Sequence, residues 1–192
     1  MTARRLERDY FEGLYAADAD PWGFETSAYE HEKYERTVEA LEGRRFGQGL
    51  DCGCSIGVLT SMLAPHCEAL LAVDVSEQAV DRARKRLADQ PHVRVERLTL
   101  PEELPEGPFD LIVCSEVLYY WDHDLLLRAL GSLEAALAPG GSLLAVHWRP
   151  PTRTYPLLGD EVHELLARTL SLERGASVEE ERYRIDRFDR VT

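Results

Sequence analysis

The chain has 192 residues, of which 44% are hydrophobic and 30% charged, a balance typical of a folded globular protein. Its 35 acidic residues outnumber its 22 lysines and arginines, giving a formal net charge of −13 at pH 7. This charge argues against a nucleic-acid partner, because such binding rests largely on neutralising phosphates. The longest apolar runs, 69–73 and 117–121, fall far short of the about 20 residues that cross a membrane. We therefore expect a cytoplasmic protein that acts on a small molecule, without a membrane or nucleic-acid partner.

Two helices are predicted near the N-terminus. The first covers 6–16, where apolar and aromatic side chains recur at helical spacing. The second runs from Ser27 to about residue 41. Ser27 and Glu30 have the spacing of a capping box, in which each side chain accepts from the backbone amide of the other residue. Aromatic residues are dense between these helices, around Trp22, so we expect residues 1–45 to form a lid.

From residue 49 onward, apolar runs typical of strands alternate with helical patterns. Such alternation predicts a doubly wound sheet, and continuous apolar strands indicate that helices cover both of its faces. The last two strands read as an antiparallel hairpin at the sheet edge. The sequence thus predicts an α/β, Rossmann-like, seven-stranded and mostly parallel sheet in one domain, with a cofactor-binding core over 46–150 and a helix and hairpin over 151–192. The strands are expected at 49–52, 69–74, 93–98, 109–114, 141–148, 172–178 and 183–191, and the helices of the core and tail at 58–63, 77–88, 125–137 and 161–170.

The turn after the first of these strands is the most informative segment. Asp51, Gly53 and Gly57 form the pattern Asp-x-Gly-x-x-x-Gly, in which the glycines let the backbone bend sharply and approach a ligand. In doubly wound folds, ligands bind at this edge of the sheet. A dinucleotide fingerprint would need glycine at positions 53, 55 and 58, but Ser55 and Val58 stand there. An ordinary tight turn is the alternative interpretation.

Asp74 ends the second predicted strand. A carboxylate in that place can accept hydrogen bonds from both hydroxyl groups of a ribose. The alternative is that it caps the helix expected over 77–88. Its combination with the preceding turn favours the ribose interpretation.

These motifs resemble those of the class I S-adenosylmethionine-dependent methyltransferases. The segment 109–120 is similar to the fourth-strand motif of that family, and the turn at 137–141 follows in the family's order. Before the core, the segments 10–15, 20–22 and 27–34 resemble the nodulation protein S family. The rhizobial namesake of that family N-methylates the deacetylated glucosamine end of a chito-oligosaccharide.

The resemblance implies an enzyme that moves a methyl group from S-adenosylmethionine to a nitrogen (or oxygen) of a small molecule, such as an amino sugar or another natural product. S-adenosylhomocysteine would be the product. A non-catalytic cofactor-binding module and, less favoured, an NAD-dependent oxidoreductase remain as alternatives. The resemblance implies cofactor contacts from Asp51, Gly53, Cys54, Ser55, Gly57, Asp74, Val75, Thr99, Leu100 and Glu116. The density of aromatic residues before the core adds Trp22 and Tyr29 to this set as lid residues that contact the cofactor.

Two residues depart from the family pattern. Ser55 stands where many relatives have the middle glycine of the turn, and its small side chain should leave binding intact. Thr99 stands where many relatives have an acidic residue for the adenine amino group, so a hydroxyl or a backbone carbonyl would have to replace that contact.

For catalysis, the candidate general bases lie where strands end at the ligand-binding edge. We favour His147 and Glu116. The alternatives are that His147 is a strand-end histidine held by a hydrogen bond, and that Glu116 binds the cofactor. No cluster of metal-ligating residues is apparent, so no metal is predicted.

Overall fold

Apolar residues alternate between two faces along the central strands, and this alternation decides which layers form. In β4 (Phe109–Ser115), Leu111 and Val113 belong to one apolar cluster, whereas Ile112 and Cys114 belong to another. All four side chains are 0% exposed. A strand that is buried on both faces needs helices on both sides of its sheet.

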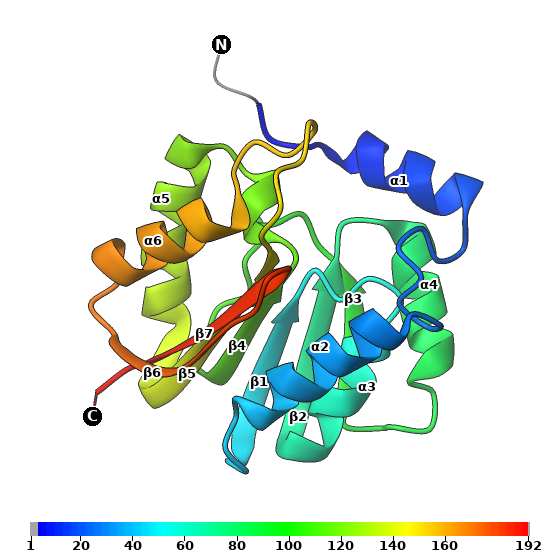
Figure 1. Cartoon of the computed structure of the whole chain (residues 1–192). Coiled ribbons are helices and arrows are strands. Elements are labelled where there is room, and N and C mark those ends of the chain that lie inside the picture. The colour runs from blue at the N-terminus through cyan, green and yellow to red at the C-terminus, as the bar shows by residue number, and fades with distance from the viewer. Residues whose placement is uncertain (1–3, 192) are drawn as a thin grey trace.

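The structure is a computed structural model that describes residues 4–191, and its central sheet has seven strands in the order β3-β2-β1-β4-β5-β7-β6 (Figure 1). The first five strands in this order pair in parallel, whereas β7 is antiparallel to β5 and β6 to β7. The predicted doubly wound sheet with its C-terminal hairpin is therefore confirmed. The remaining strands are β1 (Phe46–Cys52), β2 (Cys67–Asp74), β3 (Val93–Arg97), β5 (Leu137–Trp148), β6 (Glu173–Glu179) and β7 (Tyr183–Asp189).

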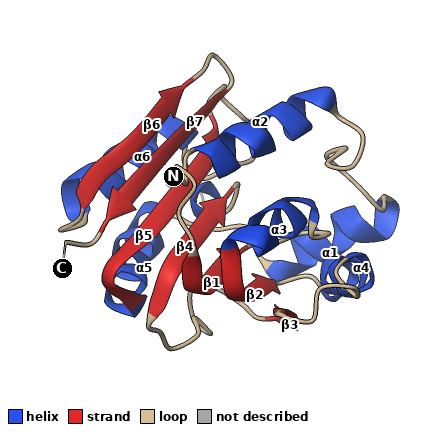
Figure 2. Cartoon of the chain, turned by 90° about the horizontal axis from the view of Figure 1, so that it is seen from below, coloured by secondary structure: helices blue, strands red, loops and turns tan. Residues whose placement is uncertain are grey.

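The helices form a layer on each side of the sheet (Figure 2). One layer contains α2 (Ala28–Glu39), α3 (Val58–Leu63) and α4 (Glu77–Arg86), and the other contains α5 (His123–Ala136) and α6 (Gly159–Thr169). By contrast, α1 (Arg8–Ala17) packs on α4. Short 3-10 helices lie at Ala64–His66 (η1) and Leu118–Tyr120 (η2). Within residues 4–191, none of the helices has the length and apolar character needed to cross a membrane.

Two local expectations from the sequence were wrong. β5 begins at Leu137, four residues before the predicted start, because Leu137 already pairs with Phe109 ahead of an irregularity in the register. The capping box of α2 is only half formed. Ser27 Oγ accepts from the N–H of Glu30 over 3.3 Å, but the Glu30 carboxylate lies 2.8 Å from the Nζ of Lys33. Lys33 is buried on the inner face of α2, and its charge draws Glu30 away from the helix end.

Candidate active site

A cleft of about 1050 Å³, open at its mouth, lies where β1, β2 and β4 end. Parallel strands bring their C-terminal ends to one edge of a sheet, so residues distant in sequence meet there. Of the twelve residues predicted for cofactor contact, all but Gly57 and Tyr29 line this cleft. The topology therefore gathers most of the predicted set around one concave space.

The turn between β1 and α3 is shaped by its two glycines. Gly53 and Gly57 have φ of 76° and 81°, a left-handed conformation that other residues adopt only with strain. A Cβ on Gly57 would lie 3.1 Å from the Cβ of Ala83, and one on Gly53 would lie 3.2 Å from the side chain of Val117. Gly57 does not line the cleft but lets α3 begin close against α4. Both glycines thus fix the path of the turn.

Ser55 takes the place of the middle glycine and adopts a left-handed conformation with φ of 51°. Two contacts hold it there. Its N–H donates to Asp74 Oδ2 over 2.8 Å, and its Oγ forms a hydrogen bond with the hydroxyl of Tyr15 from α1. Ser55 therefore adopts a backbone conformation that glycine favours, and its side chain adds a link to the N-terminal helix.

The Asp74 carboxylate accepts hydrogen bonds from the backbone of two loops, the turn after β1 and the turn after β2. In addition to Ser55, the N–H of Ser76 donates to Asp74 Oδ1 over 2.9 Å. Burial, opposed by these N–H donors, raises the pKa of Asp74 above its ordinary value. The helix α4 is capped by Ser76, whose Oγ accepts from the N–H of Ala79. Each carboxylate oxygen of Asp74 keeps a further lone pair, so it has capacity for ligand hydroxyl groups.

Asp51 lies on the floor of the cleft and is 2% exposed. Its Oδ2 accepts from Thr60 Oγ1 over 2.7 Å, which ties β1 to α3. Burial raises the pKa of Asp51 to about 6, although the hydrogen bond from Thr60 acts in the opposite direction. Through this hydrogen bond, Asp51 fixes the start of α3 relative to the end of β1.

On the far side of the turn, Thr99 and Leu100 follow β3 and line the cleft beside Val75. The N–H of Thr99 donates to Glu103 Oε2 over 2.7 Å. An acidic side chain from four residues further along the chain therefore binds the backbone of this loop. Position 99 itself presents a hydroxyl group and backbone groups to the cleft.

The N-terminal segment covers the cleft through α1 and the turn that follows it. Phe11, Tyr15 and Trp22 line the cleft, and the Tyr15 and Trp22 rings meet at 5.6 Å between centroids. Glu12 of α1 docks on the N-terminus of α4, where its Oε1 accepts from the N–H of Glu77 over 2.9 Å. Sequence reasoning named only Trp22 of these residues, although the aromatic density between 10 and 24 marked the whole segment.

Glu116 stands at the end of β4 and lines the cleft with a left-handed φ of 56°. Its Oε1 lies 2.7 Å from Lys33 Nζ, and its Oε2 accepts from the N–H of Trp148 over 3.1 Å and from the hydroxyl of Tyr119. The carboxylate is therefore held by three donors from three different parts of the chain.

His147, the other candidate base, does not line the cleft. It is 0% exposed, because α6 packs over this end of β5. The N–H of Leu118 donates to its Nε2 over 3.3 Å, so its Nδ1 carries the proton and donates to His163 Nε2 over 3.2 Å. His163 in turn bonds Asp186 over 2.7 Å. Burial and then the neighbouring His163 lower the pKa of His147 well below its ordinary value.

Tyr29 also lies away from the cleft. Its ring packs against Trp148 at 5.9 Å and Tyr183 at 6.0 Å between centroids, with the guanidinium of Arg182 at 4.0 Å. Tyr29 lies on the side of α2 that packs against β7, so its ring faces the C-terminal hairpin. A different residue of the same helix, Tyr34, lines the cleft.

Comparison with known proteins identifies the family. The model of the nodulation protein S (NodS) family matches residues 7–149, which is more than half of the chain. The chain belongs to the nodulation protein S family. The family prediction is thereby confirmed, and the match contains every residue that lines the cleft except Arg5 and Leu6.

Individual relatives agree with this assignment. Nodulation protein S of Rhizobium tropici is 37% identical over 131 residues, which cover 67% of this chain and 55% of that protein. The Bradyrhizobium diazoefficiens protein is 38% identical over 134 residues, which cover 65% and 61%. The matched part thus spans less than two thirds of these relatives.

Among solved structures, the N-methyltransferase NodS from Bradyrhizobium japonicum in complex with S-adenosylhomocysteine superimposes with a TM-score of 0.86. It is 28% identical, and the match covers 95% of this chain and 97% of that one. The Rossmann-like methyltransferase fold is therefore common to both chains, including the C-terminal hairpin that lies outside the family match.

Proposed function

We propose that the chain is an S-adenosylmethionine-dependent methyltransferase whose acceptor is a small molecule. The observation that carries this proposal is the link between the β1–α3 turn and Asp74. The N–H of Ser55 in this turn donates to the Asp74 carboxylate, and both residues line the cleft. The complex of the related NodS with S-adenosylhomocysteine supports the same cofactor here.

The residues present fit this cofactor. Asp74 has carboxylate lone pairs left for the ribose hydroxyls, the turn at 53–55 offers a backbone surface without bulky side chains, and Thr99 and Leu100 form the wall beyond it. When bound, S-adenosylmethionine supplies a methyl group on a positively charged sulfur. The chain has to hold an acceptor in line with that methyl group and keep water out, and alignment of this kind is a large part of catalysis.

The N-terminal region is proposed to act as the lid. Of the segment 1–45 that the sequence marked, α1 and the turn after it cover the cleft, whereas Leu41 beyond α2 is 0% exposed in the core. Replacing Glu12 with alanine should loosen α1 from α4 and weaken S-adenosylhomocysteine binding several-fold. Asp9→Ala on the exposed side of the same helix is the matched control. Equal affinity of both variants would argue against the lid.

For the acceptor, we propose a nitrogen nucleophile such as the amino group of an amino sugar. The support is the N-methyltransferase activity in the description of the related NodS structure. A further support is that Glu116, the carboxylate at the end of β4, already accepts three hydrogen bonds, whereas a hydroxyl acceptor would need a free base to remove its proton. An oxygen acceptor is the second outcome of an acceptor screen.

The experiment that tests the proposal is calorimetric titration of the purified protein with S-adenosylhomocysteine, with NADH as the control ligand. Micromolar binding of S-adenosylhomocysteine alone is the expected result. Binding of NADH alone would favour an oxidoreductase. If S-adenosylhomocysteine binds but transfer from labelled S-adenosylmethionine to a panel of amines and alcohols is absent, a cofactor-binding module becomes the better description.

A further inference from the structure

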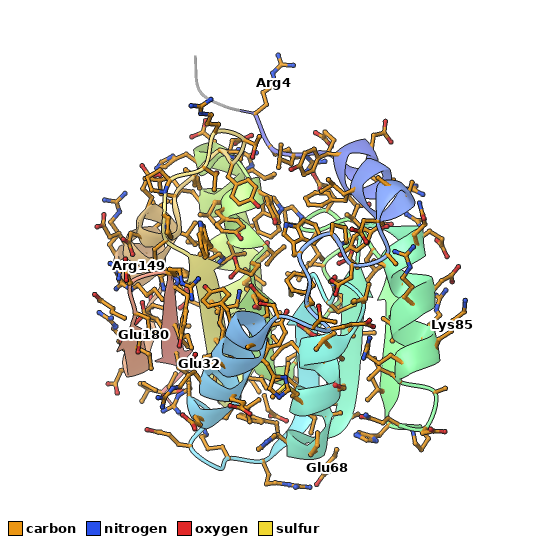
Figure 3. The ribbon with its side chains drawn as sticks, turned by 45° about the vertical axis from the view of Figure 1, so that its right-hand side comes forward. Arg4, Glu32, Glu68, Lys85, Arg149 and Glu180 are labelled. Carbon is orange, nitrogen blue, oxygen red and sulfur yellow. The ribbon has the colours of Figure 1, made fainter. Side chains whose placement is uncertain are left out.

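Lys33 is one of only two lysines in the chain, and the two lie in opposite environments. Lys85 lies on the exposed side of α4, where Figure 3 shows it at the surface. Glu32, the neighbour of Lys33 on α2, is also exposed. The side chain of Lys33 itself is only 2% exposed. Burial of a lysine is costly unless its charge is paired, so its partners indicate why it is there.

The partners of Lys33 are two carboxylates and two aromatic rings. Its Nζ lies 2.7 Å from Glu116 Oε1 and 2.8 Å from Glu30 Oε2. The rings of Tyr29 and Tyr34 have their centroids 5.4 Å and 5.8 Å from the same atom. Burial by itself lowers the pKa of Lys33, but the two carboxylates outweigh it and raise the pKa above its ordinary value. Lys33 is therefore a buried lysine that is paired with two carboxylates.

Glu116 connects the buried Lys33 to the cleft. Of the carboxylates that contact Lys33, only Glu116 lines the cleft, and its side chain is 13% exposed. Tyr119 and the Trp148 amide occupy its second oxygen while Lys33 occupies the first. Donors on both oxygens restrict the rotation of a carboxylate.

We propose that Lys33 is a positioning residue that holds the Glu116 carboxylate in a single orientation, facing the cleft. This inference rests on the proposed methyltransferase function. During transfer the lone pair of a neutral amine forms the new bond to the methyl carbon as the carbon–sulfur bond breaks. The electron pair of that bond stays on sulfur, and the positive charge moves to the nitrogen.

A fixed carboxylate suits this movement of charge. It stabilises a positive charge on the acceptor nitrogen without taking its proton, as preorganised charges do in other active sites. The extra proton of the methylated amine then leaves to water after release. In this arrangement Glu116 faces the cleft and Lys33 holds it in place.

The first test uses the free protein labelled with [15N]lysine, in which only Lys33 and Lys85 carry the label. Lys85→Arg assigns the two side-chain signals. We expect the Lys33 ammonium protons to exchange with water more slowly than those of exposed Lys85, and the Lys33 signal to shift in Glu116→Gln. A Lys33 signal that does not shift in Glu116→Gln overturns the proposal.

The second test measures the orientation of Glu116 through the backbone amide of Trp148, whose N–H donates to it. We expect hydrogen exchange of that amide to be about tenfold or more faster in Lys33→Met, as loss of a hydrogen bond to a charged group implies. Lys33→Arg should restore it. The Trp121 amide, which donates to Leu118 O, is the internal control. Because Lys33→Met also lowers the stability of the whole protein, the Trp148 exchange rate is compared with the Trp121 rate in the same variant. A ratio of the two rates equal to the wild-type ratio would overturn the positioning role.

Both tests are independent of any ligand. Failure of S-adenosylhomocysteine to bind would count against the proposed function, whereas a Lys33 signal that does not respond to Glu116→Gln would count against this inference alone. If Lys33→Met does not fold, the Lys33 signal in Glu116→Gln and the arginine variant still decide the question.

Discussion

The cleft has two walls that are built in different ways. The wall that we propose for the cofactor consists of residues 53–55 with Asp74, whose carboxylate accepts from nearby backbone N–H groups. The wall that we propose for the acceptor is centred on Glu116, whose partner Lys33 is 83 residues away and whose second partner, Trp148, is 32 residues away. The first wall depends on local backbone shape, and the second depends on the packing of α2, β4 and β5 against one another.

This difference predicts different sensitivities. Backbone donors remain when a side chain is replaced, so changes in the cofactor wall should weaken ligand binding more than folding. Buried charges in the acceptor wall lose their compensation when one partner is removed, so changes there should weaken folding first.

The largest effect is expected for Lys33→Met. It leaves the carboxylates of Glu30 and Glu116 buried without their cation, and removal of one partner from a buried ion pair costs about 3–5 kcal/mol. Urea denaturation at pH 7 measures the change. Lys85→Met is the exposed control and should leave the free energy of unfolding unchanged within about 0.5 kcal/mol. If the two substitutions lowered the free energy of unfolding equally, the proposed difference between the two walls would be wrong.

The second effect is a pH dependence from Asp51. Its pKa is about 6 in the folded protein and near 4 when unfolded, so the folded state holds the proton more tightly. The contribution of Asp51 to stability therefore falls as pH rises from about 4 to 6, by at most about 3 kcal/mol. Comparing the unfolding free energies of wild type and Asp51→Asn at pH 4.5 and pH 7 isolates this group. A difference that is the same at both pH values would show that Asp51 does not titrate in this range.

His147→Leu should cost about 2 kcal/mol of stability, because the Leu118 N–H and the His163 ring lose a buried partner. Since His147 does not line the cleft, the affinity for S-adenosylhomocysteine should change less than threefold. Thermal unfolding and calorimetry measure the two quantities. A stable variant that binds the cofactor product but loses transfer by a hundredfold would restore His147 as the general base.

Asp74→Ala should show the opposite pattern. Loss of the carboxylate should weaken S-adenosylhomocysteine binding by about 1–3 kcal/mol, because ligand hydroxyls are left unpaired. The same calorimetric titration measures it, with Asp110→Ala at the other end of the sheet as the control for a strand-end aspartate. Unchanged affinity of Asp74→Ala would place the ribose elsewhere.

The smallest effect is expected for Ser55→Gly. The glycine relieves a left-handed backbone worth about 1 kcal/mol but removes the hydrogen bond to Tyr15, which has a similar value. Stability should therefore change by less than about 1 kcal/mol, as measured by urea denaturation. A large loss would mean that the link to α1 dominates.

The sequence by itself determined the order of strands and helices, the turn at Asp51 to Gly57, the carboxylate at Asp74 and the family. These features are local: a left-handed glycine, a strand end or an apolar alternation has the same meaning in any chain with this pattern. Only the tertiary structure decided that His147 is enclosed beneath α6, that Tyr29 faces the hairpin, and that Lys33 reaches Glu116. Those outcomes depend on which faces of distant elements meet, and the spacing of residues within one element does not specify that.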